Sequence, residues 1–443
     1  MKVGKIIVTA AAAGLVSVGA SAQSPAELQQ AAQQAMQAAQ QAMQAAKAAQ
    51  AAADQAQAAL AKTQQAAAQA APVAPAGGGQ LSGLTYTNGA NSATLYGLID
   101  VTISHNNNAD KAGNSVTGTR TAWFSGNRWG LTGKHDLGTG NGLKAIFRLE
   151  SEFESQTGDM DTPGNLFNRD AWLGFESESL GKLTFGRQNA LARDPAGSAV
   201  YGDPYGSAKA NLSEGGYSNN NNFKQLIFYA GSATGTRYDR GIVWKKNIGN
   251  AVAGLAYQFG NVPGSFNKGS TETGSLAYNG SNYTVAGFVT NANVAGLTNR
   301  TYSIGGNFRP NSVVRLNAGY FHYTAEQPLA IGKRTDNAWT ASAKFTPQGK
   351  MDYEVGYQVM SANNAAVNGG GFVVNAYSDV TGATAAATGK RKTFYASTFY
   401  HVDKSMELYL AFDHLSTTGG YLASTANGFN SQNEVGLGMR YKF

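Results

Sequence analysis

The chain has 443 residues with 55 Gly, 21 Tyr, 20 Phe and no Cys, which excludes disulfides, thiolate chemistry and Cys-ligated zinc. The formal net charge of +7 is too mild for the length to indicate a nucleic-acid partner. After the first stretch of the chain, no continuous apolar run reaches the ~20 residues of a membrane helix, so a helical membrane protein is excluded.

Residues 1–22 have the pattern of a secretory signal. Two lysines precede an apolar run from Ile6 to Val18, and Ala20-Ser21-Ala22 forms a small-x-small cleavage site. The alternative is a short membrane anchor, but the apolar run is shorter than a bilayer span. The pattern therefore predicts export from the cytoplasm with a cleaved signal peptide.

Residues 23–71 are rich in Ala and Gln, which are good helix formers, and Ser24-Pro25 offers a helix start. The heptad a and d positions are Met36, Ala39, Met43, Ala46, Ala53 and Leu60, with Gln50 and Gln57 interrupting the seam. Two interpretations stay open. The helix is either a coiled-coil stalk of a symmetric oligomer or a solvated spacer, because such a seam buries little apolar area. Residues 72–92, with Pro and Gly, are predicted as a linker.

From residue 93 to residue 443 the chain is predicted to be strand after strand. The residues alternate between apolar and polar, as Trp129 and Leu131 do against Arg128 and Thr132, and such alternation gives a strand two different faces. The predicted strands are 93–105, 127–136, 142–153, 168–177, 181–189, 237–247, 250–260, 270–279, 282–291, 300–308, 312–323, 336–346, 350–361, 392–402, 406–416 and 431–443.

The connections between these strands alternate in length. Every second one is a tight turn, as at Ser179-Leu180-Gly181, and the intervening ones are long and rich in Gly, Asn, Ser and Thr. Short turns at one rim and long loops at the other are typical of an outer-membrane β-barrel. A soluble β-sandwich has no reason to separate its loop lengths in this way.

The last strand supports the same interpretation. Val435, Leu437, Met439, Tyr441 and Phe443 alternate with Gly and charged residues, and the chain stops on the aromatic. The alternative, a soluble edge strand, would leave a flat apolar edge exposed to aggregation. Tyr441 and Phe443 are therefore predicted to act as the signal for barrel assembly, with Phe443 lying at the membrane interface.

Several motifs resemble the general trimeric porins of beta- and related proteobacteria. They are Arg128-Trp129-Gly130-Leu131, Gly142-Leu143-Lys144-Ala145-Ile146-Phe147, Leu166-Phe167-Asn168-Arg169, Gly186-Arg187-Gln188 and Tyr441-Lys442-Phe443. The resemblance covers roughly residues 95–443. It implies an all-β fold, a 16-stranded antiparallel transmembrane β-barrel, whose third long loop folds inward and narrows the pore of a homotrimer.

The same resemblance implies passive diffusion of ions and small hydrophilic solutes across the outer membrane, in contact with its lipid. This sequence departs from the general pattern in its N-terminal Ala/Gln-rich helix and in the length and Asn content of the third loop, residues 189–236. A second hypothesis is an outer-membrane anchor whose N-terminal helix tethers the membrane to the cell wall. Lys47 and Lys62 permit such a contact, although no peptidoglycan-binding motif is visible.

Charged residues form the candidate site. The basic residues expected to line the pore are Arg128, Lys134, Lys144, Arg148, Arg187, Arg237 and Arg315. Arg187 falls on the same side of its strand as the outward residues Leu183 and Phe185, and either a bulge at Gly186 or a position beyond the lipid band would reconcile it with the pore. The third loop offers the opposing acids Asp194, Asp203 and Glu214. A ring of charge is how wide pores discriminate ions, so the cations predict a preference for anions; the alternative is that they are simply hydrated lumen residues.

Nothing in the sequence requires catalysis, a cofactor or a metal. Five His are spread over different strands and loops without metal-ligand spacing: His105, His135, His322, His401 and His414. The remaining alternative is an outer-membrane hydrolase with Ser and His on neighbouring strands, which counting residues does not exclude. The prediction is a channel and not an enzyme.

Overall fold

The computed structural model describes residues 84–121, 123–193, 231–367, 380–420 and 429–443. The predicted signal peptide and Ala/Gln-rich helix lie outside these residues, and so do Asp194, Asp203 and Glu214. Among the described residues, no helix combines the length and the apolar character needed to cross a membrane.

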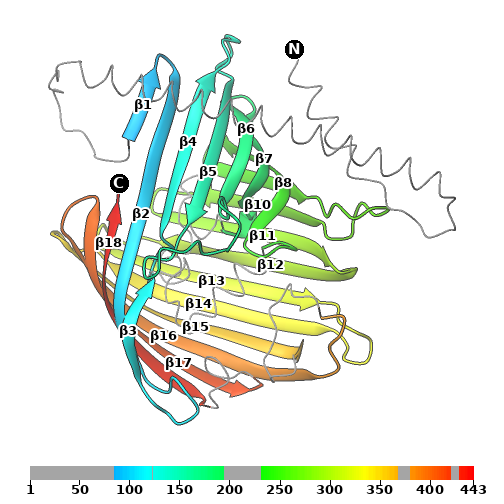
Figure 1. The fold of residues 1–443 in the computed structure, drawn as a ribbon, viewed down its shortest axis with the longest axis vertical. Helices are drawn as coiled ribbons and strands as arrows, with labels where there is room; N and C mark the ends of the chain where they lie inside the picture. The colour runs from blue at the N-terminus through cyan, green and yellow to red at the C-terminus, as the bar shows by residue number, and fades with distance from the viewer. Residues whose placement is uncertain (1–83, 122, 194–230, 368–379, 421–428) are drawn as a thin grey trace, which may run out of the picture. The chain divides into compact units, whose positions relative to one another are not determined.

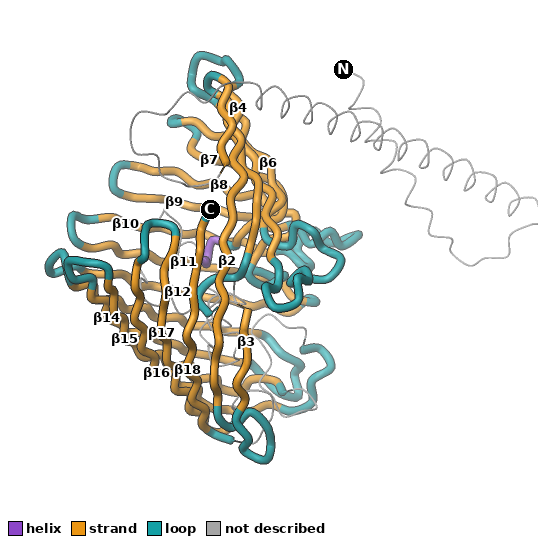
Figure 2. The backbone as a smooth tube through the Cα atoms, turned by 60° about the vertical axis from the view of Figure 1, so that its left-hand side comes forward, coloured by secondary structure: helices purple, strands orange, loops and turns teal. Residues whose placement is uncertain are grey.

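Antiparallel strands make up most of the described chain, and Figures 1 and 2 show them following one another around the fold. Their bounds are β1 (Leu84–Asn88), β2 (Asn91–Asn106), β3 (Val116–Thr121), β4 (Arg128–Asp136), β5 (Lys144–Glu152), β6 (Asp170–Ser177), β7 (Gly181–Asn189), β8 (Arg237–Ile248), β9 (Ala251–Gln258), β10 (Thr271–Asn279), β11 (Tyr283–Val294), β12 (Leu297–Phe308), β13 (Val314–Ala325), β14 (Arg334–Phe345), β15 (Met351–Ala366), β16 (Ala386–His401), β17 (Met406–Gly419) and β18 (Ser431–Lys442). The short 3-10 helix η1 spans Leu191–Arg193.

Sixteen of these strands close into an antiparallel barrel, which confirms the predicted architecture. Each barrel strand pairs with its neighbour in chain order, and β18 returns to pair with β2 from Glu434 opposite Asn106 to Lys442 opposite Leu98. A closed ring leaves no row of unpaired backbone groups, which is the condition for a sheet that lies in lipid.

Two strands, β1 and β3, were not expected from the sequence. Both pair with β2, which is 16 residues long. On one edge, β2 pairs first with β1 and then with β18. On the other edge, it pairs first with β4 and then with β3. β1 lies in the segment predicted as a linker. The pair Asn88-Gly89, with Gly89 at φ 59°, is a hairpin signal that the linker interpretation overlooked.

Alternate residues of each barrel strand face outward and inward. In β14 the outward Trp339 is 43% exposed, whereas the inward Thr340 is 2% exposed. The outward series is rich in aliphatic and aromatic side chains, and the inward series in Thr, Ser, Asn and charged residues. This is the reverse of a soluble protein and fits lipid outside and water inside.

Tight turns join the strands at one rim, where β6 and β7, for example, are separated only by residues 178–180. The opposite rim carries most of the longer connections, as predicted. The connection between β11 and β12 is an exception, because it consists of Ala295 and Gly296 alone. These residues have φ values of 53° and 93°, the left-handed conformation of a two-residue hairpin. Both strands therefore extend beyond their predicted ends, and the long loop expected there is absent.

Candidate functional site

The strand registers place five of the predicted basic residues on the inward series. Arg128 lies opposite Glu152, and Lys134 lies opposite Ile146. Lys144 and Arg148 follow on the same face of β5, because inward residues recur at every second position. Arg315 is inward on β13, where it lies opposite Lys344 on the other side of the ring from β5.

Arg148 belongs to a mostly buried ion-pair network that joins residues of β2, β5 and the start of β6. Its guanidinium lies 2.6 Å from Glu150 and 3.2 Å from Asp170, and its Nε donates to the Tyr96 hydroxyl at 2.6 Å. Arg169, which is 2% exposed, pairs with Glu150 at 2.5 Å and also with Glu152. The wall expected to be basic therefore carries its own carboxylates. Sequence reasoning missed this pairing because Arg169 and Asp170 come from the start of the next strand.

A second group of cations gathers at the short-turn rim. This lysine rim comprises the inward residues Lys134, Lys144, Lys182 and Lys245, which line one hollow together with Glu176 and Glu178. Lys134 lies 3.3 Å from Glu176, but the two side chains are 50% and 39% exposed, so water screens the pair. Lys182 lies over the Trp172 ring at 4.3 Å and opposite Lys245 in the ladder. Lys182 and Lys245 were not among the predicted site residues. The alternation of apolar and polar residues in 181–189 and 237–247 could have identified them as inward residues.

Arg187 does not join the inward series. A bulge is present at Gly186, which has φ 129°. In its pairing with β6, however, Arg187 lies opposite Ala171 and therefore points outward, as Phe185 does. Its guanidinium pairs with Asp239, and its Nε donates to the Asn168 carbonyl oxygen at 2.7 Å. The bulge does not turn Arg187 toward the pore, which corrects that expectation. The extra residue of the bulge lies in β8 and not in β7.

Arg237 opens β8 opposite Asn189 and is buried. Its Nη1 donates to the Thr236 hydroxyl at 3.1 Å. The residue thus lies inside the protein at the end of the third long connection.

The described start of the third long connection lies inside the barrel. Ala190, Leu191 and Ala192 are fully buried, and η1 contacts β9, β10 and β11. The Leu191 N–H donates to the Tyr238 hydroxyl at 3.1 Å. Leu191 belongs to one apolar cluster with inward side chains of four strands, Val243, Val252, Ala277 and Ala286. The chain therefore turns toward the lumen as soon as β7 ends; Figure 2 draws η1 in purple.

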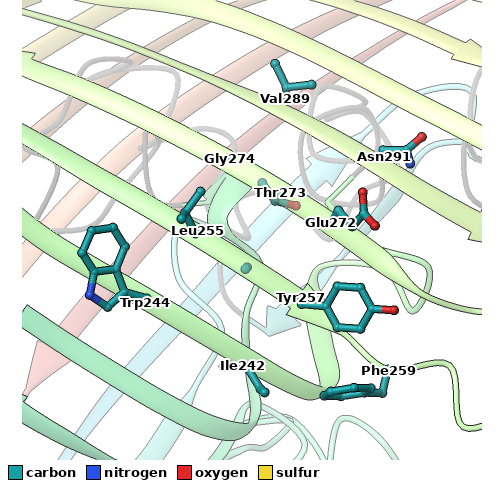
Figure 3. A pocket seen from close by; sticks show the side chains of 11 residues that line it. Ile242, Trp244, Leu255, Tyr257, Phe259, Glu272, Thr273, Gly274, Val289 and Asn291 are labelled. Carbon is teal, nitrogen blue, oxygen red and sulfur yellow. The ribbon is translucent and has the colours of Figure 1, made fainter. Parts of the chain in front are cut away.

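The groove drawn in Figure 3 lies on the outside of the barrel. Trp244, Leu255 and Val289 belong to the outward series of β8, β9 and β11, and Leu255 is 60% exposed. Gly274 leaves open space between them, since a Cβ there would meet only Leu255 at 3.9 Å. Its position and apolar lining make it a surface for lipid and not a solute site.

The described residues contain no group of three or more His, Asp or Glu placed to hold a metal ion. Four of the described His side chains make local contacts: His105, His322, His401 and His414. The imidazole of His401, for example, lies 3.1 Å from Asp352 and 3.4 Å from Glu407.

Comparisons with known proteins give one consistent result. A family model described as Gram-negative porin matches residues 45–420. An outer membrane porin protein of Bordetella pertussis is 29% identical over 384 residues, which are 80% of this chain and 94% of that protein. Outer membrane porin protein 32 of Delftia acidovorans is 38% identical over 96 residues, which are 22% of this chain and 26% of that protein.

Solved structures share the fold at low sequence identity. An anion-selective porin from Comamonas acidovorans superposes with a TM-score of 0.60 and 21% identity, covering 80% of this chain and all of that one. A trimer form of OmpT, an outer membrane protein of Vibrio cholerae, gives a TM-score of 0.54 and 14% identity over 80% of this chain and all of that one.

Proposed function

Because this chain belongs to the Gram-negative porin family and is an outer-membrane channel, we propose that it passes small hydrophilic solutes and ions with a preference for anions. The observation that carries the preference is the lysine rim, four inward ammonium groups at one mouth of the barrel. The fold likeness to a protein described as an anion-selective porin supports it.

We infer that the lysine rim contributes more to the field in the lumen than Arg148 and Arg169 do. Arg148 and Arg169 lie within ion-pair distance of Glu150, Glu152 and Asp170, so each positive charge is offset by a neighbour. At the rim four lysines face two glutamates, Glu176 and Glu178. Two unit charges about 4 Å apart interact by roughly 4 kcal/mol near a protein surface, and about 1.4 kcal/mol is tenfold in occupancy. An excess of lysines at one mouth is therefore enough to raise the local concentration of anions.

The third long connection is the proposed counterpart across the passage. We infer that residues 189–236 fold inward and present Asp194, Asp203 and Glu214 toward the cationic wall. The burial of Ala190, Leu191 and Ala192 supports the inward course. Three acids on this segment would weaken the anion preference set at the mouth without reversing it, because the lysine rim has four lysines.

The reversal potential of the native pore is measured across a KCl gradient. We expect the sign that corresponds to a higher permeability for chloride than for potassium. Lys134→Glu with Lys144→Glu should move that potential toward zero or to the cation side, because two positive charges become negative at one mouth. The preference should also weaken as salt rises, since the Debye length is about 10 Å at 0.1 M.

Lys350→Glu is the matched control. Lys350 is an exposed lysine at the end of a tight turn, where its Nζ donates to the Val402 carbonyl oxygen and lies 5.7 Å from the centre of the Tyr400 ring. Its charge reversal should leave the potential unchanged. A native pore that favours potassium, or a rim variant with the native potential, would show that the lysine rim does not govern selectivity.

We also propose that the channel is a homotrimer whose N-terminal helices meet near one axis. Closed symmetry is the usual arrangement of such assemblies, and the trimer form of a structurally similar protein supports it. With heptad spacing, Met43→Cys should give chains linked through the helix after mild oxidation. Trimeric barrels that form no linked chains would leave the spacer interpretation of residues 23–71 in place.

A further inference from the structure

The strand beside β2 is interrupted. β2 pairs with β4 from Ser92 to Leu98 and with β3 from Val101 to Asn106, so β3 and β4 lie end to end along one edge. Figure 1 shows both beside β2. Opposite Ile99 and Asp100, the ladder is replaced by the segment that joins β3 to β4. Its described part, residues 123–127, is called the lumen strap below, and all five of its residues are buried.

The carboxylate of Asp100 holds the lumen strap. Asp100 is an inward residue with no exposed surface, and it accepts hydrogen bonds from the backbone N–H groups of Trp123, Phe124 and Ser125 at 3.3, 3.0 and 2.9 Å. The Tyr409 hydroxyl donates to the same carboxylate at 2.5 Å. Three backbone N–H groups in a row donate to this one carboxylate, so a single side chain fixes three successive residues.

The aromatic side chains of the strap fill space against the inner wall. Trp123 and Phe124 cluster with the inward residues Phe399, Tyr409 and Ala411. The Phe124 ring centre lies 4.9 Å from that of Phe399 and 4.8 Å from that of Tyr409.

The Trp123 ring packs directly against the backbone of Gly436. A Cβ at this position would lie 2.6 Å from the Trp123 ring, so only glycine allows the indole to rest on β18. The register places Gly436 opposite Ser104 and Ala411, both of which face inward. The absence of a side chain here therefore belongs to the lumen surface and not to the lipid surface.

Arg440 fastens the other side of the strap. Its Nη1 donates to the Ser125 hydroxyl at 2.8 Å, its guanidinium lies 5.8 Å from the centre of the Phe124 ring, and it pairs with Glu407. The strap is thus held by charge, by hydrogen bonds and by packing from β2, β16, β17 and β18. It occupies the side of the barrel where the first and last strands meet, whereas η1 packs on β9 to β11.

We propose that the lumen strap is a fixed constriction element that limits the size of the solutes that pass, and that Asp100 is its positioning residue. The inference rests on the channel function but not on the anion preference. The described start of the third long connection packs on β9 to β11, and the strap lies on the side of the lumen formed by β2 and β16 to β18. Because four strands hold the strap, its contribution to pore size is constant.

The test compares Trp123→Ala/Phe124→Ala, Asp100→Asn and native protein. Single-channel conductance in planar bilayers and swelling rates of liposomes in neutral sugars of graded length are measured. The double variant should conduct roughly 1.5-fold more than native or better, because conduction follows pore diameter, and it should admit longer sugars. Asp100→Asn keeps the shape but loses acceptors, so its conductance should lie between the two and fluctuate more.

Gly118→Ala is the matched control, since a Cβ there meets nothing within 4 Å. It lies on β3, and its conductance should equal that of native protein. If the double variant does not assemble, the conductance and the sugar limit of Asp100→Asn test the proposal. Assembled strap variants with native conductance and the native sugar limit would overturn the proposal. The reversal potential is a separate readout, so failure of the anion preference leaves this test intact.

Discussion

Deleting Phe443 should abolish barrel assembly, leaving most of the protein unassembled in the periplasm. Phe443 extends the closing seam by two backbone hydrogen bonds, from its N–H to the Gly97 carbonyl at 3.1 Å and from the Gly97 N–H to its own carbonyl at 3.0 Å. Each backbone group left unpaired in a membrane costs several kcal/mol. Tyr441 stacks beside it with ring centres 6.2 Å apart. Outer-membrane fractionation and heat-modifiable gel mobility measure the loss.

Gly97 gives this prediction a second variant. A Cβ on Gly97 would lie 2.2 Å from the Phe443 ring, so Gly97→Val should displace the ring while the terminal residue remains. We expect reduced assembly, less severe than after deletion. Gly274→Val is the control, because Gly274 also faces outward in the middle of a strand but a Cβ there meets only Leu255 at 3.9 Å. Normal outer-membrane levels of the deletion variant would refute the role of Phe443.

Glu150→Ala should lower the free energy of unfolding of the barrel by about 3–5 kcal/mol, the usual consequence of removing one partner from a buried ion pair. Glu150 is 2% exposed and lies between Arg148 and Arg169, which are 2.6 and 2.5 Å away. The Tyr96 hydroxyl also donates to it at 2.7 Å. Its loss leaves two guanidinium groups with fewer acceptors, one of them fully buried. Urea unfolding in lipid vesicles, followed by Trp fluorescence, measures the change.

Glu176→Ala is the matched control for this experiment. Glu176 also pairs with an inward cation, Lys134 at 3.3 Å, but both side chains are substantially exposed. Exposed pairs contribute about 0–1 kcal/mol, so the control should change stability little. Equal effects of the two substitutions would mean that the Arg148–Glu150–Arg169 network is as well hydrated as the rim.

Alternation along the chain was enough to predict the sixteen barrel strands and to assign their faces. Trp129 against Arg128 and Thr132, or Leu437 against Gly436, identifies a strand between lipid and water, because side chains alternate with a period of two whatever the partner strand is. The same parity placed Arg128, Lys134, Lys144, Arg148 and Arg315 inward. The role of Phe443 in assembly stays a prediction from the sequence, and the deletion variant tests it.

Tertiary structure decided which residues meet. Glu150 meets Arg169 only because of the register between β5 and β6. Arg187 points outward because its pairing with β6 continues without a shift through the bulge. Asp100 meets Trp123 through a break in the neighbouring strand, and it meets Tyr409 through barrel closure, 309 residues along the chain. Alternation is a local property, whereas ion pairs and loop positions depend on register and ring closure. Those depend on all the strands together, and no single segment encodes them.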